Sequence, residues 1–356
     1  MEAIKITKTS NPAVKPAADK LGFGKVFSDH MFLMNYNEGL GWHDPRIVPY
    51  GPFELAPSSV VFHYAQEIFE GMKAYRTAEG KIQLFRPEEN IARMNRSGKK
   101  LCIPHIPEDI FIEALKQLVT LDADWVPAEP GTSLYIRPFA FASDEMLGVH
   151  AGKQYLFCII TSPSGSYYAD GINPVKIMIE NQEVRAVRGG TGFTKCGGNY
   201  AASLHASESA ASMGFAQVLW LDGVHMKYIE EVGAMNVMFK IDGKIVTPDI
   251  SGGSVLPGIT RKSCIQVLKD WGFEVEERLL TVDELIEAAE SGALEEAWGC
   301  GTAAVVSPIG LIRYQDKDHI VAGNKIGPLT QKLYDELTGI QWGSRPDTRG
   351  WVFPIC

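Results

Sequence analysis

Cysteine is scarce in this sequence, and the few cysteines are scattered. No C-x-x-C pair occurs among the six, which are Cys102, Cys158, Cys196, Cys264, Cys300 and Cys356. This spacing argues against a disulfide framework or a zinc site and fits reduced thiols in a cytosol. Long apolar runs are also missing, since none approaches the roughly 20 residues that cross a bilayer. The segment Met1–Lys5 begins no apolar stretch of a secretory signal, so we expect a soluble, cytoplasmic protein without a membrane partner.

Positive charge is in deficit as well. The chain carries 34 Lys and Arg against 43 Asp and Glu, for a net charge of -9. Nucleic-acid-binding proteins usually present a basic face, so this balance argues against a nucleic-acid partner. At 356 residues the chain exceeds the size that one core usually serves, which predicts two domains. It contains no internal repeat.

Strands and helices are predicted in both halves of the chain. Alternating or continuous apolar runs predict strands at 31–36, 81–86, 134–139, 155–160, 175–179, 217–221, 273–276 and after 304. The run 155–160 is apolar throughout, so it should be a central strand. Helical spacing and capping signals predict helices from 87, after 107, and at 200–213, 256–272, from 281 and 328–337.

Turn signals then suggest how the domains are divided. Asp242-Gly243 is typical of a two-residue hairpin turn. The strongest loop signal is the Ser-, Pro- and Gly-rich stretch 162–171. We therefore predict an α/β (α+β) protein with a smaller N-terminal domain (1–165), an interdomain loop (166–174) and a larger C-terminal domain (175–356).

One lysine lies among five glycines in the stretch 188–200, whose sequence is RGGTGFTKCGGNY. Glycine lets the backbone come close to a ligand, so Lys195 is a phosphate clamp, a nucleophile or simply a solvated lysine. The P-loop pattern requires Gly before the lysine and Ser or Thr after it. Here Thr194 precedes Lys195 and Cys196 follows, which disfavours a nucleotide-binding P-loop.

The surroundings of this lysine favour a cofactor. Arg185 lies ten residues upstream, Glu230-Glu231 precede a predicted strand, and 256–260 places free backbone N–H groups at a helix start. Such a helix start is a ready anion site. An amine, a carboxylate and a phosphate site together suggest pyridoxal 5'-phosphate held by Lys195 as a Schiff base.

Six ordered motifs make this sequence resemble the branched-chain amino-acid aminotransferases of the fold-type-IV pyridoxal-phosphate enzymes. The similarity runs from about Phe23 to Phe353. The motifs are His63–Tyr75, Leu134–Pro138, Lys195–Tyr200, Glu231–Asn236, Leu256–Arg261 and Gly301–Ala303. The resemblance implies a two-domain fold with the cofactor at the domain interface. It also implies a homodimer and a role in branched-chain amino-acid biosynthesis.

By the same resemblance, Lys195 binds the cofactor and moves the proton between substrate and cofactor as the catalytic residue. Glu231 pairs with the pyridine nitrogen. Arg93, Ile259 and Thr260 hold the phosphate, and Tyr200 contacts the phenolic oxygen. Arg185 and Thr302 complete the cofactor site. We expect Glu230 to lie at the surface and assign no catalytic role to Cys196.

Substrate recognition needs a carboxylate site and an apolar pocket. The resemblance implies that Thr302 and Ala303 present backbone N–H groups to the α-carboxylate. Tyr135 and Arg137, two apart on one strand and hence on one face, would receive the γ-carboxylate of glutamate. The apolar lining is implied to be Phe23, Tyr64, Phe69, Tyr135, Leu147, Val149, Tyr167 and Ala303. Three of these, Tyr64, Leu147 and Val149, would reach into the neighbouring subunit's site.

Two positions depart from relatives. Ala234 replaces a threonine of some relatives, and Ala304 and Ser307 stand where mammalian relatives carry a redox C-x-x-C, so we expect no such thiol switch. No metal is expected. The predicted function is amino-group exchange between leucine, isoleucine or valine and 2-oxoglutarate. The alternatives are a D-amino-acid transaminase or aminodeoxychorismate lyase on the same fold, a P-loop nucleotide-binding protein, and a non-catalytic cofactor-binding protein.

Overall fold

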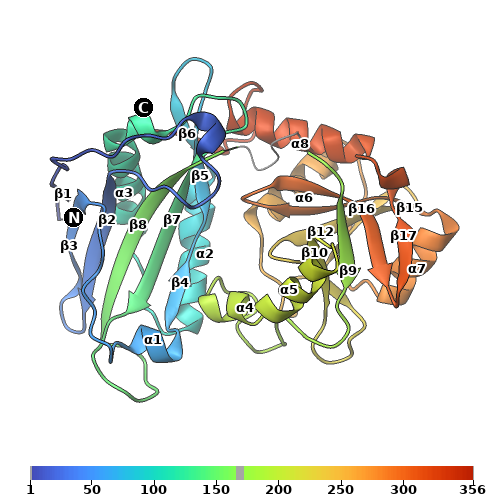
Figure 1. Cartoon of the computed structure of the whole chain (residues 1–356), viewed down its shortest axis with the longest axis horizontal. Helices are drawn as coiled ribbons and strands as arrows, with labels where there is room; N and C mark the ends of the chain where they lie inside the picture. Colours follow the sequence, from blue (N-terminus) through green and yellow to red (C-terminus); the bar gives the residue numbers. More distant parts are fainter. Residues whose placement is uncertain (1, 166–171, 356) are drawn as a thin grey trace. The chain divides into compact units, whose positions relative to one another are not determined.

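The computed structural model describes residues 2–165 and 172–355, which divide into two compact units. The first unit contains residues 1–169, 194–197 and 339–356, and the second contains 170–193 and 198–338 (Figure 1). The predicted division assigns 175–356 to one domain and differs from this one at two segments. Thr194–Gly197 and Gly339–Cys356 make most of their contacts with the first unit, so sequence continuity does not follow spatial grouping. Most of the predicted interdomain loop lies outside the described residues.

The first unit is built on a nine-stranded sheet with the order β1-β3-β2-β8-β7-β5-β6-β18, in which β4 also pairs with β7. Its strands are β1 (Lys5–Ile6), β2 (His30–Asn37), β3 (Gly41–Pro49), β4 (Glu67–Phe69), β5 (Met72–Arg76), β6 (Ile82–Phe85), β7 (Ser133–Ala142), β8 (Gln154–Ser164) and β18 (Val352–Pro354). The apolar strand predicted at 155–160 is indeed central, because β8 pairs with β2 on one side and β7 on the other.

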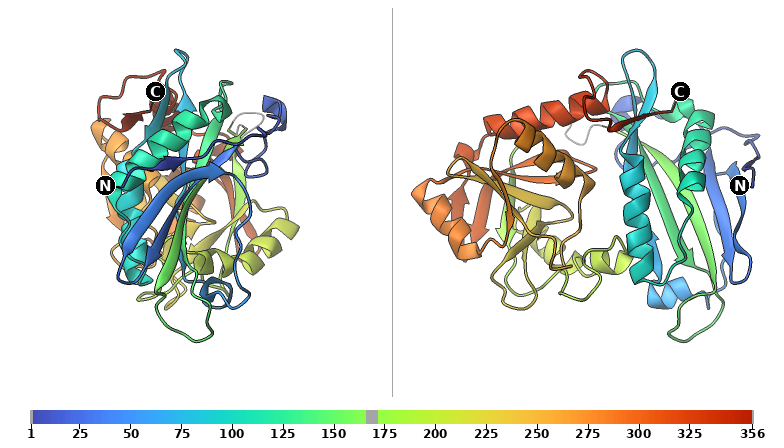
Figure 2. Two further views of the ribbon diagram at one scale, coloured as in Figure 1. Left: turned by 90° about the vertical axis from the view of Figure 1, so that its left-hand side faces the viewer. Right: turned by 180° about the vertical axis from the view of Figure 1, so that it is seen from behind.

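Two helices, α2 (Pro87–Lys100) and α3 (Glu108–Leu121), pack together on one face of this sheet (Figure 2). Pro87 at the first turn and the acids Glu88 and Glu89 favour the start of α2. Its buried face carries Ile91 and Met94 but also the polar Asn90, Arg93 and Ser97. The short helix α1 (Val60–Tyr64) precedes β4. Buried polar side chains are normally hydrogen-bonded, so we expect these residues of α2 to have hydrogen-bond partners in the core.

The second unit contains another nine-stranded sheet with the order β11-β10-β9-β16-β15-β12-β13-β14, in which β17 pairs with β16. Its strands are β9 (Val175–Ile179), β10 (Gln217–Leu221), β11 (Ile229–Val232), β12 (Asn236–Ile241), β13 (Lys244–Pro248), β14 (Val275–Arg278), β15 (Leu294–Gly301), β16 (Val305–Tyr314) and β17 (Lys317–Ile320). Its core joins strand residues such as Ile177, Leu219 and Phe239 to Leu285 of a covering helix.

Helices accompany the strands of the second sheet in the chain. They are α4 (Gly197–Ala201), α5 (Leu204–Ser212), α6 (Ile259–Asp270), α7 (Val282–Ser291) and α8 (Pro328–Gln341). Contacts join α5 to β10, α6 to β14 and β15, and α7 to β15 and β17. The last residues of α8 belong to the first unit. Single 3-10 turns occupy Ala18–Lys20, Ala123–Trp125 and Ala322–Asn324.

Most predicted elements are confirmed, with two local differences. The helix predicted at 200–213 is two helices, α4 and α5. The loop predicted at 162–171 begins later, because β8 continues to Ser164, and its residues 166–171 lie outside the described part. The Asp242-Gly243 turn is confirmed, since both residues have positive φ, as a primed hairpin turn requires. Within 2–165 and 172–355, no helix combines the length and hydropathy needed to span a membrane.

Candidate active site

Hydrogen bonds made by the backbone of Lys195 fix this residue in the first unit. Its carbonyl oxygen accepts a hydrogen bond from the Phe69 N–H of β4 (2.9 Å), and its N–H donates to Ser97 Oγ of α2 (3.1 Å). Two residues on, the Gly197 N–H donates to Glu67 Oε1. The ammonium nitrogen lies 4.8 Å from the centre of the Phe69 ring. The lysine is therefore anchored on both sides by β4, with α2 as a third support.

The burial of Lys195 favours its neutral amine. Burial, followed by the nearby Arg93 guanidinium, lowers the pKa of Lys195 to about 8, while the Glu70 carboxylate opposes this effect. A lysine near the surface stays almost fully protonated at neutral pH, because its ordinary pKa is near 10.4. Lys195 thus has the deprotonated fraction that nucleophilic attack on a carbonyl requires.

Arg93 is held by a carboxylate that the sequence analysis did not assign. Glu70 accepts from Arg93 Nε and a terminal nitrogen, each at 2.8 Å, and also from Asn90 Nδ2 (2.8 Å) and the Gly71 N–H (3.2 Å). The Glu70 side chain is wholly buried and Arg93 is 4% exposed. Burial alone would raise the pKa of Glu70, but Arg93 and the donated hydrogen bonds bring it below its ordinary value. The pair is therefore charged, and one edge of the guanidinium is fixed in direction.

Four of the predicted substrate residues come together in the first unit. An Arg137 terminal nitrogen donates to Tyr135 Oη (2.9 Å), which confirms that the two side chains share a face of β7. The Arg137 guanidinium stacks over Phe69 at 4.6 Å, and Phe23 packs edge-on against Tyr135 at 4.9 Å. Gly71 makes this arrangement possible, because a Cβ there would overlap Tyr135 Oη. The group combines apolar ring surfaces with one guanidinium, and Lys195 contacts it through Phe69.

Tyr64, Leu147 and Val149 form a separate exposed group on the same unit. Their exposed fractions are 40%, 66% and 88%. Tyr64 Oη accepts from the Gly148 N–H (3.0 Å), which ties the end of α1 to the loop that carries the other two. Tyr167, the remaining predicted lining residue of this half, lies outside the described residues.

In the second unit, Glu231 and Arg185 form a buried ion pair. Arg185 Nε lies 3.1 Å from Glu231 Oε2, and the two side chains are less than 10% exposed. Glu231 Oε1 accepts from the Leu256 N–H (2.7 Å) and from Asn236 Nδ2 (3.2 Å). Arg185 also donates to the carbonyl oxygens of Gly192 and Ser254. The carboxylate is therefore held in the interior by one guanidinium and two N–H donors.

The expectation that Glu230 lies at the surface is wrong. Glu230 is 7% exposed, and all four residues of β11 are buried. Its Oε1 accepts from Ser254 Oγ, and its Oε2 has no hydrogen-bond partner among the described residues. Burial raises the pKa of Glu230 to about 7, against the opposing effects of Ser254 and Arg185. Sequence patterns assigned neither Glu230 nor Ser254 a role in the site. Two adjacent acidic residues, such as Glu230 and Glu231, usually indicate a solvent-exposed segment.

The predicted phosphate site in this unit is a helix start. Gly258 precedes α6 in an extended conformation, and Ile259 and Thr260 form its first turn with exposed fractions of 8% and 9%. A Cβ at Gly258 would overlap Asn236 Oδ1, so this glycine is required for the close approach. The first N–H groups of a helix have no partners within it and attract anions.

The other predicted cofactor and substrate residues of the second unit lie on two segments. Tyr200 is on α4. Thr302 and Ala303 lie in the turn between β15 and β16. Cβ atoms placed on Gly299 and Gly301 would come within 3.1 Å of Val232 and Met235. The two glycines thus let the turn at 301–303 approach the turn that follows Glu231.

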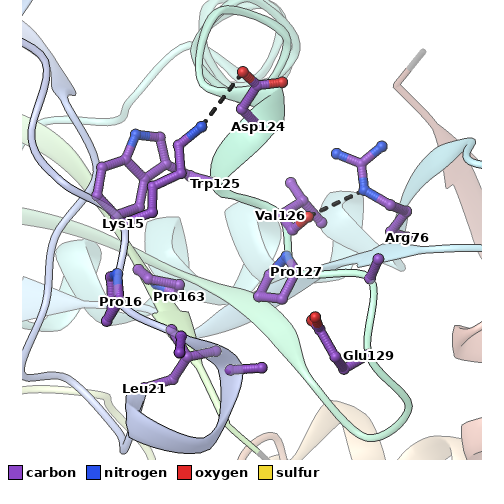
Figure 3. A pocket seen from close by; sticks show the side chains of 13 residues that line it. Lys15, Pro16, Leu21, Arg76, Asp124, Trp125, Val126, Pro127, Glu129 and Pro163 are labelled. Atoms are coloured by element: carbon purple, nitrogen blue, oxygen red, sulfur yellow. Dashed lines mark hydrogen bonds and ion pairs between the residues drawn. The ribbon is translucent and has the colours of Figure 1, made fainter.

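A cavity elsewhere in the first unit includes none of the predicted site residues. It has a volume of about 490 Å³ and lies between the N-terminal arm and residues 124–129 (Figure 3). Its cationic side chains are already engaged: Lys15 pairs with Asp124 (3.3 Å), and Arg76 donates to the carbonyl oxygens of Val126, Gly80 and Ala123. We therefore do not regard it as the active site. Within the described ranges, no cluster of three His, Cys, Asp or Glu side chains is arranged to bind a metal ion.

Comparison with known proteins identifies the family. Residues 67–312 match the model of the amino-transferase class IV family. The Bacillus subtilis (strain 168) branched-chain-amino-acid aminotransferase 2 is 52% identical, covering 100% of this chain and 98% of the relative. The T.th. branched-chain amino acid aminotransferase, solved with N-(5'-phosphopyridoxyl)-L-glutamate, matches with a TM-score of 0.74 and 28% identity, covering 91% of this chain and 98% of that one.

A second solved structure agrees. The branched-chain amino acid aminotransferase of Thermobaculum terrenum in its PLP form matches with a TM-score of 0.76 and 26% identity, covering 91% of this chain and 98% of that one. The two-sheet α/β architecture is thus that of the fold-type-IV aminotransferases. The chain belongs to the class IV aminotransferase family and, within it, to the branched-chain-amino-acid aminotransferases.

Proposed function

We propose that this chain transfers the α-amino group of leucine, isoleucine or valine to 2-oxoglutarate, with pyridoxal 5'-phosphate as cofactor. The observation that carries the proposal is the anchored Lys195, whose pKa is lowered to about 8 beside the fixed Arg93 guanidinium. Membership of the family excludes the P-loop alternative. The relatives of known structure were solved with phosphopyridoxyl-glutamate or in a PLP form, which supports the choice of cofactor.

The residues present fit this cofactor by the chemistry of their donors. Arg93 and the helix start at Ile259 and Thr260 provide cationic and N–H donors for a phosphate. The Glu231 carboxylate, paired with Arg185, suits a protonated pyridine nitrogen. When bound, the cofactor supplies an electrophilic carbon and a sink for electrons.

The proposed work of the side chains follows from their types. Lys195 would hold the cofactor, and its amine would move the proton at the substrate Cα as general base and acid. Glu231 would hold the proton on the ring nitrogen, with Arg185 as its cationic partner. Tyr200 would donate to the cofactor's phenolic oxygen.

Substrate selection divides between polar and apolar groups. The N–H groups of Thr302 and Ala303 receive the α-carboxylate. Phe23, Phe69 and Tyr135 supply apolar contact for branched side chains, and Arg137 with Tyr135 Oη receives the γ-carboxylate of glutamate. An apolar pocket alone would leave that carboxylate desolvated at high cost, so the guanidinium explains how one site accepts both substrates. We also propose a homodimer in which Tyr64, Leu147 and Val149 contribute to the partner's site.

The proposal is tested by measuring the activity of the purified protein with a panel of amino-acid donors. Leucine, isoleucine and valine should each convert 2-oxoglutarate to glutamate and bleach the visible absorbance of the bound cofactor. A D-amino acid should do neither. Activity in a Lys195→Ala variant would refute the proposed role of the lysine, and a preference for D-amino acids would favour the alternative transaminase. Size-exclusion chromatography with light scattering tests the dimer.

A further inference from the structure

A buried chain of polar contacts connects Glu230 to the Arg185–Glu231 pair. Ser254 stands in the middle: its hydroxyl donates to Glu230 Oε1, and its carbonyl oxygen accepts from Arg185. Arg185 Nε in turn lies 3.1 Å from Glu231 Oε2. Glu230, Glu231, Arg185 and Ser254 are all less than 10% exposed. Few groups and little water lie between Glu230 and Arg185. The electrostatic interaction between them is therefore weakly screened, so a change in the charge of Glu230 alters the potential at Arg185.

The two oxygens of Glu230 differ in their surroundings. Oε1 has the Ser254 hydroxyl, whereas Oε2 is buried without a partner among the described residues. A carboxylate with an unsolvated oxygen is costly, and protonation of that oxygen removes the cost. The geometry thus favours a neutral Glu230 unless the nearby positive charge offsets the loss of hydration.

Both signs of charge face Glu230 from the elements around it. Arg185 lowers the pKa of Glu230, while Glu231 and Asp222 raise it. Asp222 is itself occupied by four backbone N–H donors, at residues 224, 225, 227 and 228. The other charged or titratable residues lining the same cavity, which has a volume of about 480 Å³, are Arg188, His225, Tyr228 and Asp249. Arg188 and His225 are exposed, so protons and water reach this side of β11 from bulk solvent.

We propose that Glu230 is a positioning residue whose protonation state sets the charge balance of the Arg185–Glu231 pair. The proposal rests on the proposed function in one respect, namely that Glu231 pairs with the cofactor's ring nitrogen. An ionised Glu230 draws Arg185 away from Glu231 and adds negative potential. Both effects strengthen the hold of Glu231 on a ring-nitrogen proton. When Glu230 is neutral, Arg185 interacts with Glu231 alone, and Glu231 then binds the ring-nitrogen proton more weakly.

The expected pH window lies near neutrality. Burial raises the pKa of Glu230 to about 7, so Glu230 is neutral well below pH 7 and ionised well above it. Glu230→Gln imitates the neutral state at every pH. The variant and the wild type should therefore agree at acidic pH and diverge as pH rises. Asp249→Asn is the matched control, because Asp249 lines the same cavity but takes its hydrogen bonds from the neighbouring residues Ile250 and Ser251.

The first measurement uses the protein without cofactor. The 15N resonance of Arg185 Nε, identified by its loss in Arg185→Lys, should shift with a midpoint near pH 7 in the wild type and in Asp249→Asn. In Glu230→Gln this shift should disappear. Ser254→Ala keeps the acid but removes a hydrogen bond that lowers its pKa, so the midpoint should move to higher pH. Ser254→Ala also serves as the deciding variant if Glu230→Gln does not fold. An Arg185 shift that persists unchanged in Glu230→Gln, or an unmoved midpoint in Ser254→Ala, overturns the proposal.

The second measurement uses the cofactor. The ratio of the Glu230→Gln and wild-type dissociation constants for pyridoxal 5'-phosphate should be near one at acidic pH and rise roughly threefold to tenfold above pH 8, as one buried charge at short range implies. A ratio that is constant with pH contradicts the proposed link to the cofactor. If no variant binds the cofactor, the proposed function fails, and the Arg185 resonance still decides whether Glu230 controls the pair.

Discussion

Replacing Glu70 by glutamine should destabilise the first unit more than most single substitutions do. The side chain keeps its shape, but Arg93, Asn90 and the Gly71 N–H then compete for one neutral oxygen, and the new amide group faces donors. Arg93 is 4% exposed and loses its ion pair with the Glu70 carboxylate. Removing one partner of a buried pair typically costs about 3–5 kcal/mol. Equilibrium urea unfolding of Glu70→Gln should show a loss of that size.

A double-mutant cycle separates the ion pair from general disruption. Arg93→Met alone leaves the Glu70 charge buried, so it should also be costly. The combined Glu70→Gln, Arg93→Met variant contains neither buried charge, and its loss should fall short of the sum of the single losses by at least about 1–2 kcal/mol. Losses that simply add would refute the reasoning, since they would mean that the two groups act independently.

The same variant tests what the pair is for. If Glu70 orients Arg93 toward a phosphate, Glu70→Gln should weaken binding of pyridoxal 5'-phosphate by roughly tenfold or more, as loss of a charge-assisted contact implies. Binding of pyridoxal, which lacks the phosphate, should change little. Equal weakening for the two ligands would assign Glu70 a structural role only.

Three further outcomes follow from the geometry. Gly71→Ala should push Tyr135 from its position, because the new methyl overlaps its hydroxyl; the KM for glutamate should rise more than the KM for leucine. Gly258→Ala overlaps Asn236 at the start of α6 and should weaken cofactor binding measured by fluorescence titration, with Gly272→Ala, at a glycine with positive φ beyond the end of that helix, as a control for general instability. In cofactor-free protein, reductive methylation followed by mass spectrometry should show that Lys195 reacts with a midpoint near pH 8, below that of surface lysines; a midpoint near 10 would contradict the effect of its surroundings.

Sequence patterns anticipated features that depend on local periodicity. The apolar run 155–160 identified the central strand, and the two-residue spacing of Tyr135 and Arg137 identified their shared face. Both conclusions need only the alternation of side chains along a strand. The Asp242-Gly243 turn needed only the preference of these residues for positive φ.

Features that depend on long-range contacts were not anticipated. Glu70 pairs with Arg93 across 23 positions, and no local pattern links them. Glu230 and Glu231 are adjacent on a strand, which predicts that one faces solvent, yet the cavity-lining segments around 222–225 and 249–255 bury Glu230 as well. Thr194–Gly197 joins the first unit through β4 and α2, although both flanking segments belong to the second. Sequence can therefore name residue types suited to a site, whereas burial depends on the remainder of the fold.

Protein stability alone does not explain why two arginine–glutamate pairs are buried. A buried ion pair gains little over a well-packed apolar pair, because the loss of hydration offsets the attraction. Glu70–Arg93 and Glu231–Arg185 nevertheless occupy the interior of the two units, each with additional hydrogen bonds to the carboxylate. In the proposed function, the ion of each pair that would bind the cofactor is Arg93, for the phosphate, and Glu231, for the ring nitrogen. The paired group orients that ion in the absence of cofactor. Replacing either pair by apolar residues of similar volume should therefore preserve the fold and abolish cofactor binding.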